Sequence, residues 1–275
     1  DSLSTNIATH LIHLGMLSGD RAAIWAPNMN EWVLAAIAIQ KAGGVLVPIN
    51  TRMKAKEASY ILNNSEAKFL FSVKTFLGTD YFELLENEDL PHLLHQISLD
   101  ESTSNELNQS FHSLKEQALE VKLPEVSETD MADIIFTSGT TGKPKGVISS
   151  HLQNIKVFDY WSTYIGLNKN DHYLIVNPFF HTFGYKAGWL ASAMRGATAY
   201  PCPVFDADKI IKIINEHKIS MLPGPPTLYQ SILTSQLIDK LDISSLRLGV
   251  TGAASIPVQL IKDMKERLGF ETVIT

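Results

Sequence analysis

The sequence is poor in several features that would restrict its function. Cys202 is the only cysteine, which excludes an internal disulfide and a cysteine-based metal cluster. The 23 Lys and Arg are outnumbered by 29 Asp and Glu, and a net charge of -6 argues against nucleic acid as a partner. The longest apolar run, Trp32 to Ile39, is too short to be a transmembrane segment. No signal peptide is visible, so the expected location is cytoplasmic.

Familiar nucleotide and catalytic motifs are also missing. The chain contains neither the GxGxxG of Rossmann domains nor the GxSxG of serine hydrolases. A Walker A loop needs glycine five residues before its Gly-Lys pair, but Thr137 takes that place before Gly142-Lys143. Local histidine pairs occur without further ligands, so no metal site is expected in this chain.

What the sequence does contain is an alternation of apolar strands and helices. Hydrophobic residues make up 45% of the chain and charged residues 19%, as in globular proteins. We expect strands at residues 22–26, 45–49, 68–72, 131–136, 172–176, 198–202, 220–222, 246–250 and 271–275, and helices at 2–15, 31–42, 54–64, 111–121, 151–164, 184–195, 208–217, 227–233 and 257–268. This alternation predicts an α/β fold with a parallel, doubly wound sheet. Two subdomains are expected, at residues 1–125 and 126–275.

One stretch carries most of the chemistry. A predicted strand ends at Phe136, and six residues that are only hydroxyl-bearing or glycine follow it. Glycine allows backbone N–H groups to converge on an anion, and hydroxyls and lysines add donors and charge. The predicted phosphate-binding residues are Thr137, Ser138, Gly139, Thr140, Thr141, Gly142, Lys143 and Lys145. A solvated turn is the simpler reading of such a cluster, but strand patterns on both sides fix the ends of this one.

At these residues the sequence resembles the adenylate-forming enzymes, which include acyl-CoA synthetases, luciferases and peptide-synthetase adenylation domains. The segment Phe136–Val147 reads FTSGTTGKPKGV, the signature of that family. In the family this loop holds the β- and γ-phosphates of ATP. The resemblance implies the layered αβαβα large domain of acyl-CoA synthetases, with mostly parallel sheets flanked by helices.

Two further segments match the family. The first, PFFHTFG, resembles its aromatic and histidine motif and makes His181 the candidate catalytic residue beside the reacting carboxylate. Without the resemblance, a core histidine bonded to backbone would be favoured. The second, Thr251-Gly252-Ala253-Ala254, is a small-residue turn that resembles the family's Gly-Ala-rich segment beside the adenine and acyl pocket, although tight strand–helix packing also explains it. The implied pocket residues are Phe180, Phe183, Gly184, Gly252, Ala253 and Ala254.

The resemblance implies a two-step reaction. A carboxylic acid and Mg-ATP give an acyl-adenylate and pyrophosphate, and coenzyme A then takes the acyl group. The implied substrates and cofactors are therefore a small carboxylic acid, fatty or bulky and cyclic, with ATP, Mg2+ and CoA. The motifs around His181 and Pro223 look closest to bacterial CoA ligases acting on the bicyclic propionate left by steroid-ring degradation.

The chain departs from the family at its ends. The family's adenine- and Mg2+-binding segment, its hinge and its small C-terminal domain would follow Thr275, and its first strands would precede Asp1. We therefore expect a piece of the large domain, truncated at both ends, with little activity alone. Two alternatives stay open: an adenylation domain that loads a carrier protein, and a non-enzymatic remnant, alone or as a homo-oligomer, that binds a nucleotide or an anion.

Overall fold

The computed structural model describes residues 1–100, 108–137, 143–252 and 254–275. The chain divides into two compact units, Asp1–Lys156 and Val157–Thr275. The sequence-based division after residue 125 differs from this one because the strand that follows it, β8 (Met131–Thr137), pairs with β2 (Val45–Pro48) of the first unit. The hairpin of the phosphate loop therefore belongs to the first unit.

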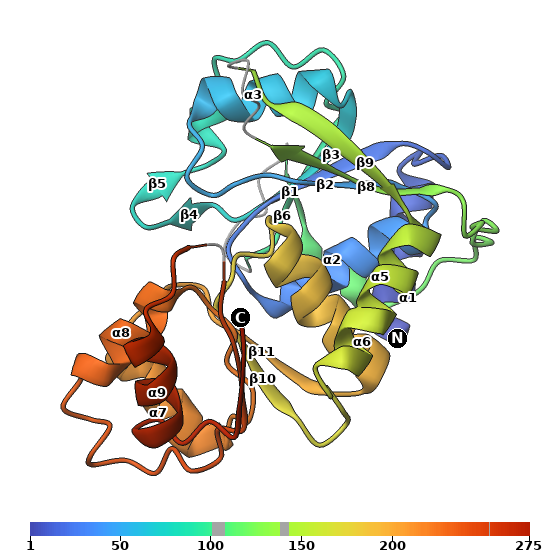
Figure 1. Cartoon of the computed structure of the whole chain (residues 1–275). Coiled ribbons are helices and arrows are strands. Elements are labelled where there is room, and N and C mark those ends of the chain that lie inside the picture. Colours follow the sequence, from blue (N-terminus) through green and yellow to red (C-terminus); the bar gives the residue numbers. More distant parts are fainter. Residues whose placement is uncertain (101–107, 138–142, 253) are drawn as a thin grey trace. The chain divides into compact units, whose positions relative to one another are not determined.

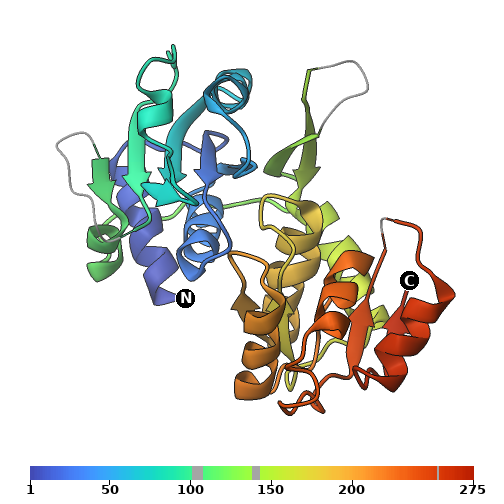
Figure 2. The ribbon, with the colours of Figure 1, turned by 90° about the vertical axis from the view of Figure 1, so that its left-hand side faces the viewer.

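The first unit is built on a seven-stranded sheet of order β7-β6-β3-β1-β2-β8-β9. Its strands are β1 (Arg21–Trp25), β2, β3 (Ala67–Ser72), β6 (His95–Ser98), β7 (Asn108–Ser110), β8 and β9 (Lys145–Ser150). All neighbours are parallel except β8 and β9, which form an antiparallel hairpin that projects from the sheet (Figure 2). The predicted parallel α/β fold is confirmed.

The helices of this unit cover both faces of the sheet. They are α1 (Ser2–His13), α2 (Asn30–Lys41), α3 (Ala55–Asn64), the 3-10 turn η1 (Glu83–Leu85) and α4 (Phe111–Glu116). The chain runs from β1 to β2 on one side and back across β1 to β3 on the other. Because such crossovers are right-handed, α2 and α3 lie on opposite faces, as Figure 1 shows. A small hairpin of β4 (Thr75–Phe76) and β5 (Thr79–Asp80) follows β3.

The second unit repeats the parallel α/β pattern. Strands β10 (His172–Ile175) and β11 (Thr198–Pro201) pair in parallel, as do β12 (Leu248–Val250) and β13 (Thr272–Ile274). Met221 bridges β10 and β12, also in parallel, so the order is β11, β10, Met221, β12, β13. The predicted strand at 220–222 is thus a single bridge.

Helices α5 (His151–Tyr164), α6 (Ala191–Arg195), α7 (Ala207–His217), α8 (Pro226–Thr234) and α9 (Val258–Glu266) complete the chain, with a π-helix, η2 (Phe183–Leu190), directly before α6. In Figure 1, α7, α8 and α9 lie on one side of β10 and β11 and α6 lies on the other. The core beneath these three helices is mostly aliphatic, with Ile210, Ile214, Ile232 and Met264 almost fully buried around the equally buried ring of Tyr229. This packing stabilises the edge from which the candidate site residues emerge.

Candidate functional site

The predicted phosphate loop is the connection of a β-hairpin. Thr137, the last residue of β8, pairs with Lys145, the first residue of β9. Ser138, Gly139, Thr140, Thr141 and Gly142 lie outside the described residues, so the loop itself stays a prediction. Thr137, Lys143 and Lys145 are exposed at its two ends. The strands predicted on both sides of the loop are confirmed.

The hairpin is fastened to the rest of its unit at both limbs. On β8, the carboxylate of the buried Asp133 accepts a 2.6 Å hydrogen bond from the amide of Asn154 in α5. On the returning limb, the hydroxyl of Tyr60 in α3 donates to the carbonyl oxygen of Pro144 at 3.2 Å. Elements distant in sequence thus hold the loop ends in place, which agrees with a binding loop more than with a free connector.

Gly146 allows the two strands of the hairpin to approach closely. A Cβ at this position would lie 2.7 Å from Cγ2 of Ile134 on β8, inside van der Waals contact. Close strand packing therefore explains why the GKPKG segment ends in glycine, independently of any role of this glycine in the loop.

The candidate catalytic residue, His181, lies in the loop that leaves β10. Its N–H donates to the carbonyl oxygen of Pro178 at 3.0 Å, and its own carbonyl oxygen accepts from Tyr185 N–H at 3.0 Å. The ring is exposed, and its Nδ1 accepts a 3.2 Å hydrogen bond from the N–H of Phe183. A neutral ring held this way carries its proton on Nε2 and presents that N–H to solvent as a donor.

The segment that follows His181 is a π-helix, a feature that sequence reasoning missed by predicting an ordinary helix. At Gly184 the backbone is so close to the preceding loop that a Cβ would lie 2.2 Å from the carbonyl oxygen of Pro178 and 2.3 Å from that of Asn177. Only glycine fits there. Wide helical turns of this kind are frequent at functional sites. The apolar periodicity of a sequence does not distinguish a π-helix from an α-helix.

The two candidate pocket phenylalanines, Phe180 and Phe183, are half-buried. Phe183 contacts Trp161 of α5 edge-on, with ring centroids 5.9 Å apart. Phe158, one turn earlier in α5, contacts the same indole edge-on at 6.4 Å. An aromatic wall therefore stands next to the His181 loop within the second unit.

The strand order explains why these residues gather in the second unit. The chain passes from β10 to β11 on one side and returns across β10 to Met221 on the other, so the order reverses between β10 and Met221. In open α/β sheets, ligands bind outside the carboxyl ends of the strands at such a reversal. The loop of His181 leaves β10 at this edge, and the bend at Pro223 and Gly224 follows Met221 at the same edge.

The Gly-Ala-Ala turn leaves β12 at that edge too. Gly252 has open space where a Cβ would point, and Ala254 is exposed, while Ala253 lies outside the described residues. The sequence places Thr251 in this turn but assigns it no role in the pocket. Its side chain is 3% exposed, and its buried Oγ1 lacks a hydrogen-bond partner among the described residues. A buried hydroxyl of this kind calls for a water or ligand partner. Its one signal in sequence is its place at a strand end.

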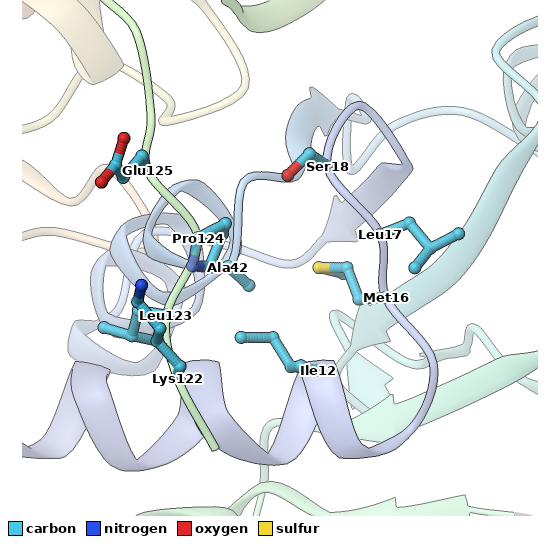
Figure 3. A pocket seen from close by; sticks show the side chains of 9 residues that line it. All are labelled: Ile12, Met16, Leu17, Ser18, Ala42, Lys122, Leu123, Pro124 and Glu125. Carbon is cyan, nitrogen blue, oxygen red and sulfur yellow. The ribbon is translucent and has the colours of Figure 1, made fainter.

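The first unit also has a groove, at the other end of its strands. This cavity of about 320 Å³ is lined by Ile12, Met16, Leu17, Ser18, Ala42, Lys122, Leu123, Pro124 and Glu125. Figure 3 shows Ile12 and Met16 on one side of it and Ala42, Leu123 and Pro124 on the other. It lies beside the turn that enters β1, so it is separate from the phosphate hairpin. Among the described residues, no group of three His, Cys, Asp or Glu side chains could hold a metal ion.

Comparison with known proteins gives a consistent result. The family model described as AMP-binding enzyme matches residues 1–275. A methyl-dioxo-octahydro-indenyl-propanoyl:CoA ligase of Mycobacterium tuberculosis is 42% identical over 271 residues, covering 98% of this chain and 54% of the relative. The ligase of the same name from Rhodococcus jostii is 41% identical over 269 residues, covering 94% and 52%. The chain spans about half the length of these curated relatives.

Solved structures agree on the fold. An anthranilate CoA ligase in complex with anthranoyl-AMP matches with a TM-score of 0.90 and 26% identity, covering 99% of this chain and 52% of that one. The N-terminal domain of FACL13 from Mycobacterium tuberculosis, with an inhibitor bound, matches with a TM-score of 0.81 and 29% identity, covering 95% and 63%. Within the part of the chain that the structure describes, no helix has the length and apolar character to cross a membrane.

Proposed function

The chain belongs to the AMP-binding enzyme family, and from this premise we propose that it forms part of an AMP-forming acyl-CoA synthetase. In the first step, a carboxylate oxygen attacks the α-phosphorus of ATP, the bond to the β-phosphate breaks, and pyrophosphate leaves. In the second step, the thiol of CoA attacks the carbonyl carbon of the acyl-adenylate, AMP leaves, and the thiol proton passes to solvent.

The observation that carries this proposal is the fastened hairpin of β8 and β9. It presents the sequence TSGTTGKPK at the end of β8, between the anchors at Asp133 and Tyr60. In the proposal, the β- and γ-phosphates of ATP bind the loop from Thr137 to Gly142, and Lys143 and Lys145 offset the charge of the departing pyrophosphate. Charge stabilisation and positioning supply most of the catalysis in phosphoryl transfer.

His181 is assigned to the carboxylic acid in this proposal. Since the N–H of Phe183 occupies its Nδ1, the ring offers Nε2–H as a donor. That N–H would bind the substrate carboxylate and orient one of its oxygens toward the α-phosphorus. Orientation of this kind accelerates a bimolecular step without any proton transfer by the histidine.

The proposed acyl and adenylate pocket consists of Phe180, Phe183, Gly184, Gly252, Ala253 and Ala254. We propose a bulky cyclic carboxylic acid as the substrate, ahead of a linear fatty acid. The support is the 42% identity to a relative named for a fused-ring propanoyl group. The half-buried aromatic rings beside Trp161 suit a rigid apolar ring system.

Mg2+ enters this reaction as Mg-ATP, the substrate. Magnesium usually keeps several waters and binds phosphates together with one or two carboxylates. The described residues form no ready group of ligands for it. In the proposal the ion arrives at the site together with the phosphates that the loop binds.

Two measurements test the proposed function. Equilibrium dialysis with ATP and with pyrophosphate tests the phosphate loop in this chain, and we expect both to bind. Acid-dependent exchange of pyrophosphate into ATP tests the reaction, using a protein of the relatives' full length that contains this chain. The acid panel should include a fused-ring propionate, octanoate and benzoate, and the fused-ring acid should give the fastest exchange.

The outcomes separate the alternatives. Binding of neither ATP nor pyrophosphate favours a non-enzymatic remnant, and exchange with no acid on the panel would contradict the ligase. If exchange occurs but CoA releases no AMP from the adenylate, a carrier protein is the acceptor instead.

A further inference from the structure

Trp161 of α5 differs from the three other tryptophans of the chain. Trp25 and Trp32 are 0% exposed and Trp189 is 3% exposed, whereas Trp161 is half-buried. The indole N–H of Trp25 donates to the carbonyl oxygen of Asn50 at 3.0 Å. The N–H of Trp161 makes no hydrogen bond to another described residue. Since tryptophan usually finds a partner for its N–H when the ring is buried, a half-buried indole with an unused donor is suited to a ligand.

Trp161 lies against the segment that carries the candidate catalytic histidine. Its ring meets the ring of Phe183 edge-on, with centroids 5.9 Å apart. The N–H of Phe183 in turn donates to Nδ1 of His181 at 3.2 Å. Phe158, one turn earlier in α5, adds a third ring, 6.4 Å from that of Trp161. An acyl group that packs against Phe183 therefore comes within contact range of Trp161.

The two helices that carry these rings are tied together. Arg195, at the end of α6, donates from Nε to Oγ of Ser162 at 2.9 Å. Its NH2 group donates to the carbonyl oxygen and to the carboxylate of Asp159, each at 2.7 Å. Because α6 continues directly from η2, these bonds fix the spacing between α5 and the helix of Phe183. Rings that are fixed in this way lose little entropy when a rigid ligand packs against them.

The chemistry of the indole limits what its partner can be. An indole N–H is only a donor, so the partner must carry an acceptor. The neighbouring rings of Phe158 and Phe183 have no polar atom and supply none. A carbonyl or hydroxyl oxygen on an otherwise apolar ring system meets both requirements, because its carbon skeleton packs on the aromatic rings and its oxygen accepts from the N–H. Ligand sites commonly combine apolar walls with a few polar groups that fix orientation.

We propose that Trp161 is a specificity-determining residue of the acyl site, and that its N–H donates to an oxygen on the ring system of a fused-ring acid. The inference rests on the proposed function, in which Phe183 borders the acyl group. It narrows the substrate from a bulky cyclic acid to one whose rings bear an acceptor oxygen. The acid is then held at two points, its carboxylate at His181 and its ring oxygen at Trp161, which orients the carboxylate for attack.

The test measures KM and kcat for acid-dependent pyrophosphate exchange, using a protein of the relatives' full length that contains this chain. Three matched acids are compared: a fused-ring propionate with a ring ketone, the corresponding ring alcohol, and the same skeleton without a ring oxygen. The oxygen-free acid leaves the N–H unpaired, so its wild-type KM should be the highest of the three. Trp161→Phe keeps a flat ring but removes the N–H, so KM for an oxygen-bearing acid should rise about three- to tenfold. For the oxygen-free acid, KM should stay within about twofold, and kcat should change little for all three, because the ring oxygen lies away from the reacting carboxylate.

Two further variants separate the N–H from the ring and from the helix surface. Trp161→Leu also removes the flat surface, so it should raise KM for all three cyclic acids and affect octanoate less. The matched control is Tyr164→Phe, which removes a 70% exposed hydroxyl at the end of α5 and should leave every KM unchanged. Equilibrium dialysis with ATP should give wild-type affinity in each variant, and thermal unfolding shows whether each variant is folded.

Each result has a defined meaning. A rise in Trp161→Phe confined to the ketone acid identifies a carbonyl oxygen as the acceptor, a rise confined to the alcohol identifies a hydroxyl, and a rise for both means that either is accepted. An equal rise for all three acids, or none, overturns this inference and leaves the proposed function intact. Equal wild-type KM values for the three acids also overturn it, without the need for a variant. A wild-type protein that gives exchange with no acid contradicts both.

Discussion

Arg247 and Asp171 form a two-point ion pair that fastens the amino ends of the strands in the second unit. Arg247 Nε donates to Asp171 Oδ1 at 2.8 Å, and its NH2 group bonds Oδ2. Ser220, next to the bridge at Met221, adds a 2.7 Å hydrogen bond from its hydroxyl. Since Asp171 precedes β10 and Arg247 precedes β12, one carboxylate ties three neighbouring strand positions together. Ligand-binding loops leave the opposite ends of these strands.

The ion pair between Asp171 and Arg247 predicts that the free energy of unfolding decreases at acid pH. Burial acts to raise the pKa of Asp171, but hydrogen bonds from Arg247, Ser220 and the N–H of Asn168 outweigh it and lower the pKa below its ordinary value. The stabilisation is therefore complete above the unfolded-state pKa of about 4 and is lost as the pH falls through the lower folded-state value. Asp171→Asn should cost about 2 kcal/mol at pH 7 and less at pH 3.

Urea unfolding of both proteins between pH 3 and pH 7 measures this difference. Glu266→Gln, which removes an exposed carboxylate at the end of α9, serves as the control and should unfold like wild type. An Asp171→Asn variant whose deficit stays constant over that range would contradict the charge-based account.

Gly184→Ala should disrupt the loop of His181. The new methyl would lie 2.2 Å from a backbone carbonyl oxygen, and backbone yields less than a side chain does. We expect a loss of about 1–3 kcal/mol in the free energy of unfolding, the range found for overpacked cores, and weaker activity. Gly188→Ala is the matched comparison, because its methyl would lie closest to the side chain of Ile175, at 3.0 Å, and no nearer than 3.4 Å to backbone, at the carbonyl oxygen of Phe183. Equal losses in the two variants, measured by thermal unfolding, would rule out backbone crowding as the cause.

Much of this fold follows from periodicity, and the exceptions have physical causes. The helix predicted over residues 208–217 matches α7 to within one residue, since its apolar and polar positions follow the helical period. The hairpin of β4 and β5 was missed because its strands have two residues each, and Leu77 adopts φ 50° at its turn, which leucine rarely does. β6 was also missed, because His-Gln-Ile-Ser has too little apolar character to indicate a strand.

The candidate site likewise contains residues that the sequence identifies and features that only the structure reveals. Loop residues such as Thr137 and His181 could be selected from sequence because motif resemblance carries their chemistry. Thr251 could not, because its interest comes from the burial of its hydroxyl and from the lack of a hydrogen-bond partner for it among the described residues. The π-helix after Thr182 depends on backbone crowding at Gly184, which no sequence period records.

Tyr60→Phe tests whether the anchor at Pro144 positions the phosphate loop. The variant keeps the ring and removes only the 3.2 Å hydrogen bond. A neutral hydrogen bond contributes about 0.5–1.5 kcal/mol, so pyrophosphate affinity should fall roughly two- to tenfold while the unfolding temperature changes little. Tyr160→Phe removes an exposed hydroxyl in α5 and should bind pyrophosphate as wild type does. Unchanged affinity in Tyr60→Phe would show that the loop needs no such anchor.

Replacing His181 gives the sharpest test of the proposed reaction. His181→Phe keeps a flat ring but removes the Nε2–H donor, so acid-dependent pyrophosphate exchange should fall by about 10²-fold. The lost N–H binds the carboxylic acid and not the triphosphate, so the dissociation constants for ATP and pyrophosphate should stay within twofold of wild type. The control is His112→Phe, at an exposed histidine of α4, in which these constants should also be unchanged. His181→Gln supplies an amide N–H near the same place and should recover part of the rate. Full exchange activity in His181→Phe would remove this residue from the mechanism, and a parallel loss of ATP binding would move its role to the nucleotide.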